Sequence, residues 1–272
     1  IVEIDGRNVA GVKFPQDSMM KLMRGKAGTR VNLKIKRDKE LVDFGITRGK
    51  IPVKSIDVAY MMNDTTGYIK LSKFSRTTYM EFLQSMVSLK IKGMKKLVFD
   101  LRDNLGGYLN QALYISNEFL EKDQLIVYVQ GDNRARQDFK ANGEGVGRDL
   151  ELVVLINENS ASSSEIFAGA MQDNDRATIV GRRSFGKGLV QEPIYFEDNS
   201  GIRLTVAKYY TPTGRNIQKP YEKGDEESYR EDIVERYLHG EMMDEDSVPK
   251  NDSLRFVTPG GKVVYGGGGI IP

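Results

Sequence analysis

Two nearly continuous apolar runs constrain the fold of this chain more than any other feature of its sequence. They are "KKLVFDLR", residues 95–102, and "ELVVLIN", residues 151–157. Short runs that are apolar at consecutive positions are typical of strands buried on both faces of a parallel sheet. Each run is followed by a segment with helical spacing, at 108–120 and 162–173. The alternation predicts an α/β fold with helices layered on a mainly parallel sheet.

The same pattern extends in both directions and suggests two domains. Further strands are expected at 67–74, 125–130, 177–181 and 202–212, with an amphipathic helix at 76–93. Residues 1–49 form a separate small unit, in which a strand, a helix ending at a glycine and two alternating strands follow one another. Residues 50–272 form the large domain. Within it, residues 222–252 are charge-rich and are expected to be an exposed insert, a helix and loop with a solvated face.

Composition excludes several kinds of site. The 272 residues include no cysteine and one histidine, so cysteinyl metal sites, a catalytic thiol and a zinc site with two histidines are impossible. A Ser-His-Asp triad would need His239, whose acidic neighbourhood is typical of a solvated surface. The net charge of +2 gives no global field for nucleic acid. No apolar run approaches the roughly 20 residues of a membrane span. The chain opens on an apolar strand without Met, so we expect it to begin inside a domain, with any targeting segment upstream.

The glycine-rich stretch "GRRSFGKGLVQ", residues 181–191, is open to three interpretations. A phosphate-binding loop would need Ser or Thr after the lysine and a following helix, but Gly188 and a strand-like segment follow Lys187. A nucleophile of the S-x-x-K type, Ser184 with Lys187, would need helical spacing, which the glycines on both sides of the lysine disfavour. The third interpretation is a loop that delivers Lys187 to a serine elsewhere in the chain.

Two strand-to-helix turns supply what that interpretation needs. In "INENSASSSEIFAGAMQD" a cluster of serines lies between a buried strand and a helix start, where the helix dipole favours an oxyanion. The alternative is that these serines only cap the helix. In "DLRDNLGGYLNQAL" the pair Gly106 and Gly107 lets backbone N–H groups approach a ligand without side-chain obstruction. One donor from this turn and one after the serine would form an oxyanion hole.

These residues resemble the carboxy-terminal processing peptidases, also called tail-specific proteases. The resemblance rests on "NSASSSEIFAGAMQD", "GRRSFGKGLVQ", "DLRDNLGG" and "VYGGGGIIP", which occur in the family's order through nearly the whole chain. It implies a Clp/crotonase-like layered core and a serine peptidase with a Ser-Lys dyad. Residues 1–49 are similar to the later part of the PDZ domain of these enzymes. The front of that domain, with its carboxylate-binding loop, and a C-terminal helical region have no counterpart here.

The resemblance assigns roles to single residues. The nucleophile falls on Ser162, the base on Lys187 and a lysine-orienting glutamine on Gln191, with oxyanion donors at the backbone of Ser163 and of Gly106 or Gly107. An exposed lysine is protonated at neutral pH, so a lysine base needs apolar cover. Four residues of extended strand span about 13 Å, so a contact between Gln191 and Lys187 would need a bend after Gly188. The chain departs from the family at Ser163, where alanine is usual, and at Leu105, where proline or glycine is usual.

The expected function is cleavage near the C-termini of protein substrates through an acyl-enzyme. The partners are proteins or peptides with accessible C-termini, with no cofactor, no metal and no nucleic acid, and a homo-oligomer is left open. The resemblance implies a bacterial cell envelope or periplasmic location. Two alternatives remain, a non-catalytic scaffold of the same fold that binds peptides or other ligands, and crotonase-like acyl-CoA chemistry, which would need no Ser-Lys pair.

Overall fold

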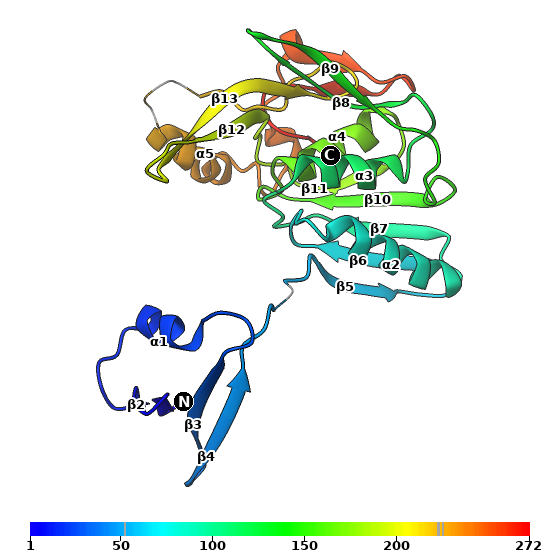
Figure 1. The fold of residues 1–272 in the computed structure, drawn as a ribbon. Helices are drawn as coiled ribbons and strands as arrows, with labels where there is room; N and C mark the ends of the chain where they lie inside the picture. The colour runs from blue at the N-terminus through cyan, green and yellow to red at the C-terminus, as the bar shows by residue number, and fades with distance from the viewer. Residues whose placement is uncertain (52, 222–223, 225) are drawn as a thin grey trace. The chain divides into compact units, whose positions relative to one another are not determined.

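The chain folds into two compact units in a computed structural model, which describes residues 1–51, 53–221, 224 and 226–272 (Figure 1). The first unit is Ile1–Val53 and the second is Lys54–Pro272. The division therefore falls slightly later than the boundary between residues 49 and 50 that the sequence suggested.

The first unit is a small antiparallel sheet with one helix. Its strand order is β2-β1-β3-β4. The strands are β1 (Glu3–Ile4), β2 (Arg7–Asn8), β3 (Arg30–Arg37) and β4 (Glu40–Thr47), and the helix is α1 (Gln16–Met23). The buried residues of its core are Ile4, Val9, Val31 and Leu33. Val31 and Leu33 lie on one face of β3, as the alternation of that segment predicts.

The second unit is built on a five-stranded sheet of order β11-β10-β7-β6-β5. These strands are β5 (Ile56–Met61), β6 (Thr66–Leu71), β7 (Lys96–Asp100), β10 (Glu151–Ile156) and β11 (Thr178–Gly181). The pairs β6·β7, β7·β10 and β10·β11 are parallel, and only β5 is antiparallel to its neighbour. The mainly parallel sheet predicted from the two apolar runs is confirmed, with β7 and β10 at its centre.

Three helices accompany the strands of this sheet: α2 (Thr78–Ile91), α3 (Leu109–Asn117) and α4 (Ser163–Asp173). Phe82 of α2 and Phe167 of α4 both meet Phe99 of β7 edge-on, at centroid distances of 5.4 and 5.1 Å. Ten of the 11 residues of α4 are buried, so this helix lies in the core rather than on the surface. The burial of α4 holds its N-terminus, where the serine cluster lies, in a fixed position.

A second sheet differs from the expected layout. It is antiparallel, with the order β12-β13-β8-β9, and its strands are β8 (Leu125–Gly131), β9 (Arg134–Lys140), β12 (Leu189–Tyr195) and β13 (Gly201–Tyr210). The segment at 125–130, which the sequence placed in the strand–helix alternation, belongs to this sheet. Its hairpin partner β9 has the polar sequence "RARQDFK", which gives no apolar signal.

The remaining elements are α5 (Glu226–Leu238), the 3-10 helices η1 (Glu245–Ser247) and η2 (Asp252–Leu254), and the hairpin β14 (Arg255–Val257) with β15 (Val263–Tyr265). None of the helices in the described ranges is long and apolar enough to cross a membrane.

The parallel sheet brings two loops to one edge. Leu155 of β10 is paired with Asp100 of β7, so both strands end side by side. The Gly106–Gly107 turn follows β7 and the serine cluster follows β10. Ligands of open α/β sheets bind outside the carboxyl ends of the strands, and this edge is where the candidate site lies.

Candidate active site

Ser162 occupies a strained turn at the N-terminus of α4. Its backbone angles are φ 55° and ψ −113°, a region that residues with a side chain rarely adopt. Such strain costs about 1–3 kcal/mol and persists only where the surroundings enforce it. The side chain is half-buried, whereas Ser163 and Ser164 beside it are buried. Ser162 is thus the serine of helix α4's first turn that stays accessible.

The turn after β7 lies directly against Ser162. Gly106 has φ +93°, and a Cβ atom on it would lie 2.8 Å from Ser162 Cβ and 2.9 Å from the Ser163 nitrogen. Gly107, with φ +147°, packs on the Phe74 carbonyl so closely that no Cβ fits. Only glycine satisfies both positions, because each combines a positive φ with backbone contact. The glycine pair therefore lies beside the turn that carries Ser162.

The N–H groups in this region are not equivalent. The Gly106 N–H donates to Asn104 Oδ1 at 2.9 Å, so it is already used. Among the hydrogen bonds of the described residues, the N–H groups of Gly107 and Ser163 donate to no protein acceptor. Ser163 holds the turn in another way, through Oγ, which donates to the Gly107 carbonyl at 3.0 Å. Two free N–H donors thus flank Ser162. Gly106 offers no free N–H, but its lack of a side chain lets the turn approach Ser162 closely.

The loop that carries Lys187 has no helix or strand of its own. It runs from Arg182 to Gly188 between β11 and β12. The Phe185 N–H donates to the Ser160 carbonyl at 3.0 Å, and the Gly188 N–H donates to Gln218 Oε1 at 2.9 Å. The loop is therefore fixed by bonds to other segments, including the one that carries Ser162.

Glu165 connects the serine turn to the lysine loop. Its Oε2 accepts the N–H of Ser162 at 2.8 Å and that of Lys187 at 2.9 Å. Its Oε1 accepts the Gly186 N–H at 2.7 Å and the Ser184 hydroxyl at 2.6 Å. Burial raises the pKa of the Glu165 carboxyl, and these four donors oppose that effect.

Sequence reasoning did not single out Glu165. A signal was present, because Ser162-x-x-Glu165 is the spacing of a capping box, in which the third residue of the helix accepts the N–H of the N-cap. That pattern predicts the bond to Ser162 but not the three bonds to the distant loop.

Lys187 and Ser162 line one pocket of about 390 Å³. Its other lining residues are Phe74, Gly107, Tyr108, Leu189, Gln191, Pro193, Arg203 and Tyr209. The Lys187 side chain is half-buried. In the part of the chain that the structure describes, its Nζ takes part in no hydrogen bond or ion pair. Lys187 and Ser162 therefore share a pocket, and the hydrogen bonds of the described residues include none between Lys187 Nζ and the Ser162 hydroxyl.

Gln191 reaches the same pocket, but its hydrogen bond goes elsewhere. Its Nε2 donates to Thr205 Oγ1 on β13, at 3.4 Å. The pairing of β12 with β13 has a register shift between Val190 and Gln191. A contact between Gln191 and Lys187 is not among the described hydrogen bonds, so the lysine-orienting role of Gln191 stays a prediction.

The other titratable or nucleophilic candidates lie outside this pocket. Ser184 is fully buried, donates to Glu165 and accepts the Ile270 N–H at 2.7 Å, which agrees with its rejection as a nucleophile. His239 is exposed just after α5.

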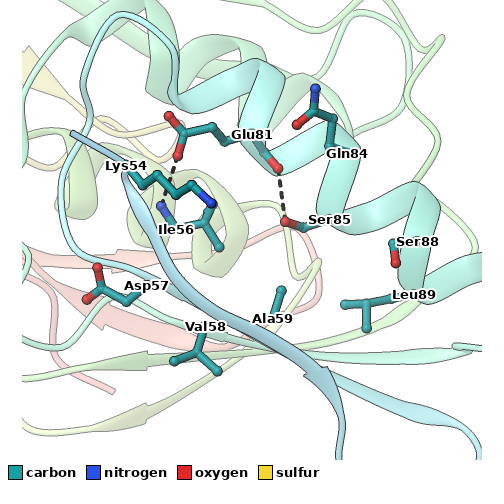
Figure 2. A pocket seen from close by; sticks show the side chains of 10 residues that line it. All are labelled: Lys54, Ile56, Asp57, Val58, Ala59, Glu81, Gln84, Ser85, Ser88 and Leu89. Atoms are coloured by element: carbon teal, nitrogen blue, oxygen red, sulfur yellow. Dashed lines mark hydrogen bonds between the residues drawn. The ribbon is translucent and has the colours of Figure 1, made fainter. Parts of the chain in front are cut away.

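A second pocket of about 370 Å³ lies between β5 and α2 (Figure 2). Its carboxylate Glu81 accepts the backbone N–H groups of Ser55 and Ile56, at 2.7 and 3.2 Å. These bonds hold the start of β5 against α2 and give Glu81 a structural role. Its lining residues include no Ser-Lys pair held on converging turns, so the pocket of Ser162 is the stronger candidate.

Comparison with known proteins decides the family. The family model described as peptidase family S41 matches residues 65–227, which include Ser162, Lys187 and both turns. The chain belongs to peptidase family S41. This result confirms the resemblance to the carboxy-terminal processing peptidases that the sequence motifs indicated.

Similar S41 proteins include curated bacterial relatives and a solved structure. A probable CtpA-like serine protease of Staphylococcus haemolyticus is 38% identical over 218 residues, covering 80% of this chain and 43% of the relative. One of Staphylococcus epidermidis is 32% identical over 272 residues, covering 98% and 50%. The structure of a photosystem II D1 C-terminal processing protease matches with 28% identity and a TM-score of 0.56, covering 80% of this chain and 59% of that one. The chain spans about half the length of the curated S41 relatives that it matches.

Proposed function

We propose that this S41 chain is a serine endopeptidase in which Ser162 is the nucleophile and Lys187 the general base. The observation that carries the proposal is that Ser162 and Lys187 line one pocket while a single oxygen of Glu165 accepts both of their backbone N–H groups. Nucleophile and base come from distant segments, and a shared acceptor fixes their relative position.

The proposed reaction proceeds through an acyl-enzyme. Lys187, as general base, takes the proton of the Ser162 hydroxyl as Oγ attacks the scissile carbonyl, and the N–H groups of Gly107 and Ser163 donate to the oxyanion. Collapse of the tetrahedral intermediate breaks the C–N bond, and the leaving amine takes the proton from Lys187. Lys187 then activates a water molecule that hydrolyses the ester and restores Ser162. The helix dipole of α4 favours the negative charge at the same place.

We further propose that the substrate is a polypeptide cleaved near its C-terminus. The printed name of a similar structure, a C-terminal processing protease, supports this specificity. So does the charge of Arg203, which lines the pocket, since the lining residues include no carboxylate. A terminal carboxylate is the anion that every such substrate carries. Assignment of residues 1–49 to a PDZ domain, of the second unit to the Clp/crotonase fold class, and of the protein to the cell envelope belongs to the same proposal.

The rival functions make different demands on these residues. A scaffold that binds peptides has no need of a strained serine beside an unpaired lysine, and acyl-CoA chemistry of the crotonase type needs the N–H groups but not Ser162 or Lys187. Strain that is kept at one accessible residue is typical of a catalytic role.

The decisive experiment compares Ser162→Ala and Lys187→Ala with two matched controls, Ser200→Ala and Lys208→Ala, which change exposed residues in the connection between β12 and β13 and on β13. We expect both site variants to lose peptide hydrolysis while keeping the wild-type melting temperature, and both controls to remain active. A fluorophosphonate should label Ser162 in the wild type. Undiminished hydrolysis in either site variant would contradict the proposal and favour the scaffold.

A further inference from the structure

Arg236 of helix α5 donates hydrogen bonds to the loop that carries the proposed base. Its Nη2 donates to the Arg183 carbonyl at 2.6 Å, and its Nη1 donates to the Ser184 carbonyl at 3.1 Å. The side chain is only 5% exposed. The charged segment at 222–252 is therefore more than the solvated insert that the sequence suggested, because this face of α5 is buried against the lysine loop.

A buried carboxylate orients the guanidinium. Glu241 Oε1 accepts from Arg236 Nε at 2.8 Å and from Arg183 Nε at 2.7 Å, and its Oε2 accepts from Arg183 Nη2 at 2.6 Å. Its side chain is 3% exposed. Arg236 thus uses one edge of its guanidinium to bind Glu241 and the remaining N–H groups to bind the loop. A lysine at this position could not reproduce that fork of donors.

A second contact fixes the other side of the same loop. The Lys219 ammonium lies 4.4 Å from the ring centroid of Phe185 and 4.1 Å from that of Tyr229 on α5. It donates to the Tyr229 carbonyl and to Asp232, both at 2.9 Å. The Lys219 N–H also donates to the Gly186 carbonyl at 2.9 Å. Helix α5 and the irregular segment that carries Lys219 therefore hold Phe185 and Gly186, the two residues that precede Lys187.

These contacts matter because the loop has no regular structure to hold it. Ser184, which Arg236 binds through its carbonyl, also donates its hydroxyl to Glu165, the residue that binds the N–H of Lys187. A displacement of about 1 Å between reacting groups can cost about 100-fold in rate. Loss of the guanidinium would leave two buried carbonyls without their donor and free the loop to shift.

We propose that Arg236 is a positioning residue for the Ser-Lys reaction, and that α5 clamps the Arg183–Lys187 loop so that Lys187 stays within reach of Ser162. The inference rests on the proposed function of Ser162 and Lys187. The inference assigns a catalytic effect to Arg236, which lies outside the pocket. It also gives α5 a role, although the composition of that segment alone predicts a solvated surface.

The test compares Arg236→Lys and Arg236→Ala with Tyr237→Ala, a change of the adjacent residue of α5, which is 66% exposed. We expect Arg236→Lys to lower kcat for peptide hydrolysis at least about tenfold with KM changed less than about twofold, since substrate contacts are intact. The fluorophosphonate labelling rate of Ser162 should fall in parallel. Guanidinium chloride at millimolar concentration should restore part of the activity of Arg236→Ala, and Tyr237→Ala should match the wild type.

Each other outcome has a definite meaning. Wild-type kcat in a folded Arg236→Lys or Arg236→Ala variant would overturn the clamp while leaving the peptidase intact. Unfolding of Arg236→Lys, seen as a lost thermal transition, would also overturn it, because the residue would then hold the fold rather than the loop. If the wild type and Ser162→Ala hydrolyse peptide equally, the proposed function itself fails.

Discussion

Oε2 of Glu165 lies 2.9 Å from the backbone nitrogen of Lys187 and accepts its N–H. The same oxygen accepts the N–H of Ser162, so one atom joins the chain at the proposed nucleophile to the chain at the proposed base. The two residues are linked through their backbone N–H groups rather than through their side chains. Because the relative position of Ser162 and Lys187 depends on the Glu165 carboxylate, substitution of Glu165 tests it.

Replacement of Glu165 by Gln should disable the enzyme without removing its bulk. A glutamine side chain has one acceptor oxygen and one NH2 group. The NH2 group would therefore face one of the two pairs of donors that the Glu165 oxygens now accept. Each unsatisfied buried group costs about 1–3 kcal/mol, and we expect the free energy of unfolding to fall by about 2–4 kcal/mol. Peptide hydrolysis should fall by about 100-fold or more, because Ser162 and Lys187 lose their common acceptor.

Urea denaturation and initial rates measure the two effects of Glu165→Gln. Glu121→Gln is the control, since Glu121 pairs with Arg148 on the surface, and both its rate and its stability should stay close to wild type. Full activity in Glu165→Gln would show that the carboxylate does not position the pair.

Gly106→Ala and Gly93→Ala separate backbone strain from damage to the site. Gly106 has φ +93° and Gly93 has φ +94°, so alanine meets the same strain of about 1–2 kcal/mol at both positions. At Gly93 the new Cβ would lie 3.4 Å from the Asp64 carbonyl, an ordinary contact, whereas at Gly106 it would collide with Ser162 and Ser163. We expect both variants to lose stability, and only Gly106→Ala to lose hydrolysis, by at least about 100-fold. Equal rates in the two variants would count against the turn as part of the site.

The fold was predictable where its signal is local. The runs that became β7 and β10, and the helices that follow them, are visible in the order of apolar residues. The second sheet was not, because β9 is polar along most of its length and gains its place only by pairing with β8. Strand formation depends on the partner strand as much as on intrinsic preference, so a polar strand leaves little trace in a single sequence.

The site shows the same limit. Ser162, Lys187 and the glycine pair follow from motifs that are contiguous in the chain. The three bonds from Glu165 to the lysine loop, and those from Arg236 to Arg183 and Ser184, join segments 19 to 53 residues apart, and no periodicity encodes them. Gln191 shows the converse, because its motif predicts a contact with Lys187 while its strand pairing directs the amide to Thr205.

An ion pair between Glu158 and Arg182 should make stability depend on pH. Arg182 donates to the two Glu158 oxygens at 2.6 and 2.9 Å and thereby holds the pKa of Glu158 below its ordinary value. The pair joins the segment before Ser162 to the start of the lysine loop. Because the folded state lowers this pKa, the stabilisation is present above about pH 4.5 and is lost as pH falls through the folded value.

Glu158→Gln tests this linkage. At pH 7 we expect the variant to be less stable by about 0.5–1 kcal/mol, a modest effect because Arg182 is partly exposed. The difference from wild type should shrink as pH falls from 7 to 3, as measured by urea denaturation across that range. A difference that is the same at pH 3 and pH 7 would show that packing, not charge, is responsible.

Arg203 should set the preference for a terminal carboxylate. It lies on β13 opposite Pro193 and lines the pocket of Ser162 and Lys187. None of the ion pairs among the described residues involves it, so its charge is available to an anion of the substrate. A partly solvated charge pair is worth up to about 1 kcal/mol, which corresponds to about fivefold in kcat/KM. We therefore expect Arg203→Gln to lower kcat/KM about fivefold for a peptide with a free C-terminal carboxylate and to leave the matching C-terminal amide unaffected.

Two comparisons make the Arg203 experiment decisive. Lys208→Gln removes the same charge from the same strand at a residue that does not line the pocket. Its kcat/KM for both peptides should equal that of the wild type. A third peptide, amidated at its end but carrying an acidic side chain near the cleaved bond, distinguishes a terminal carboxylate from a side-chain carboxylate. If Arg203→Gln lowers kcat/KM only for this third peptide, the residue selects an acidic side chain instead. An equal loss for all three peptides would mean that Arg203 supports the pocket rather than recognising charge, and the C-terminal preference would then need another source.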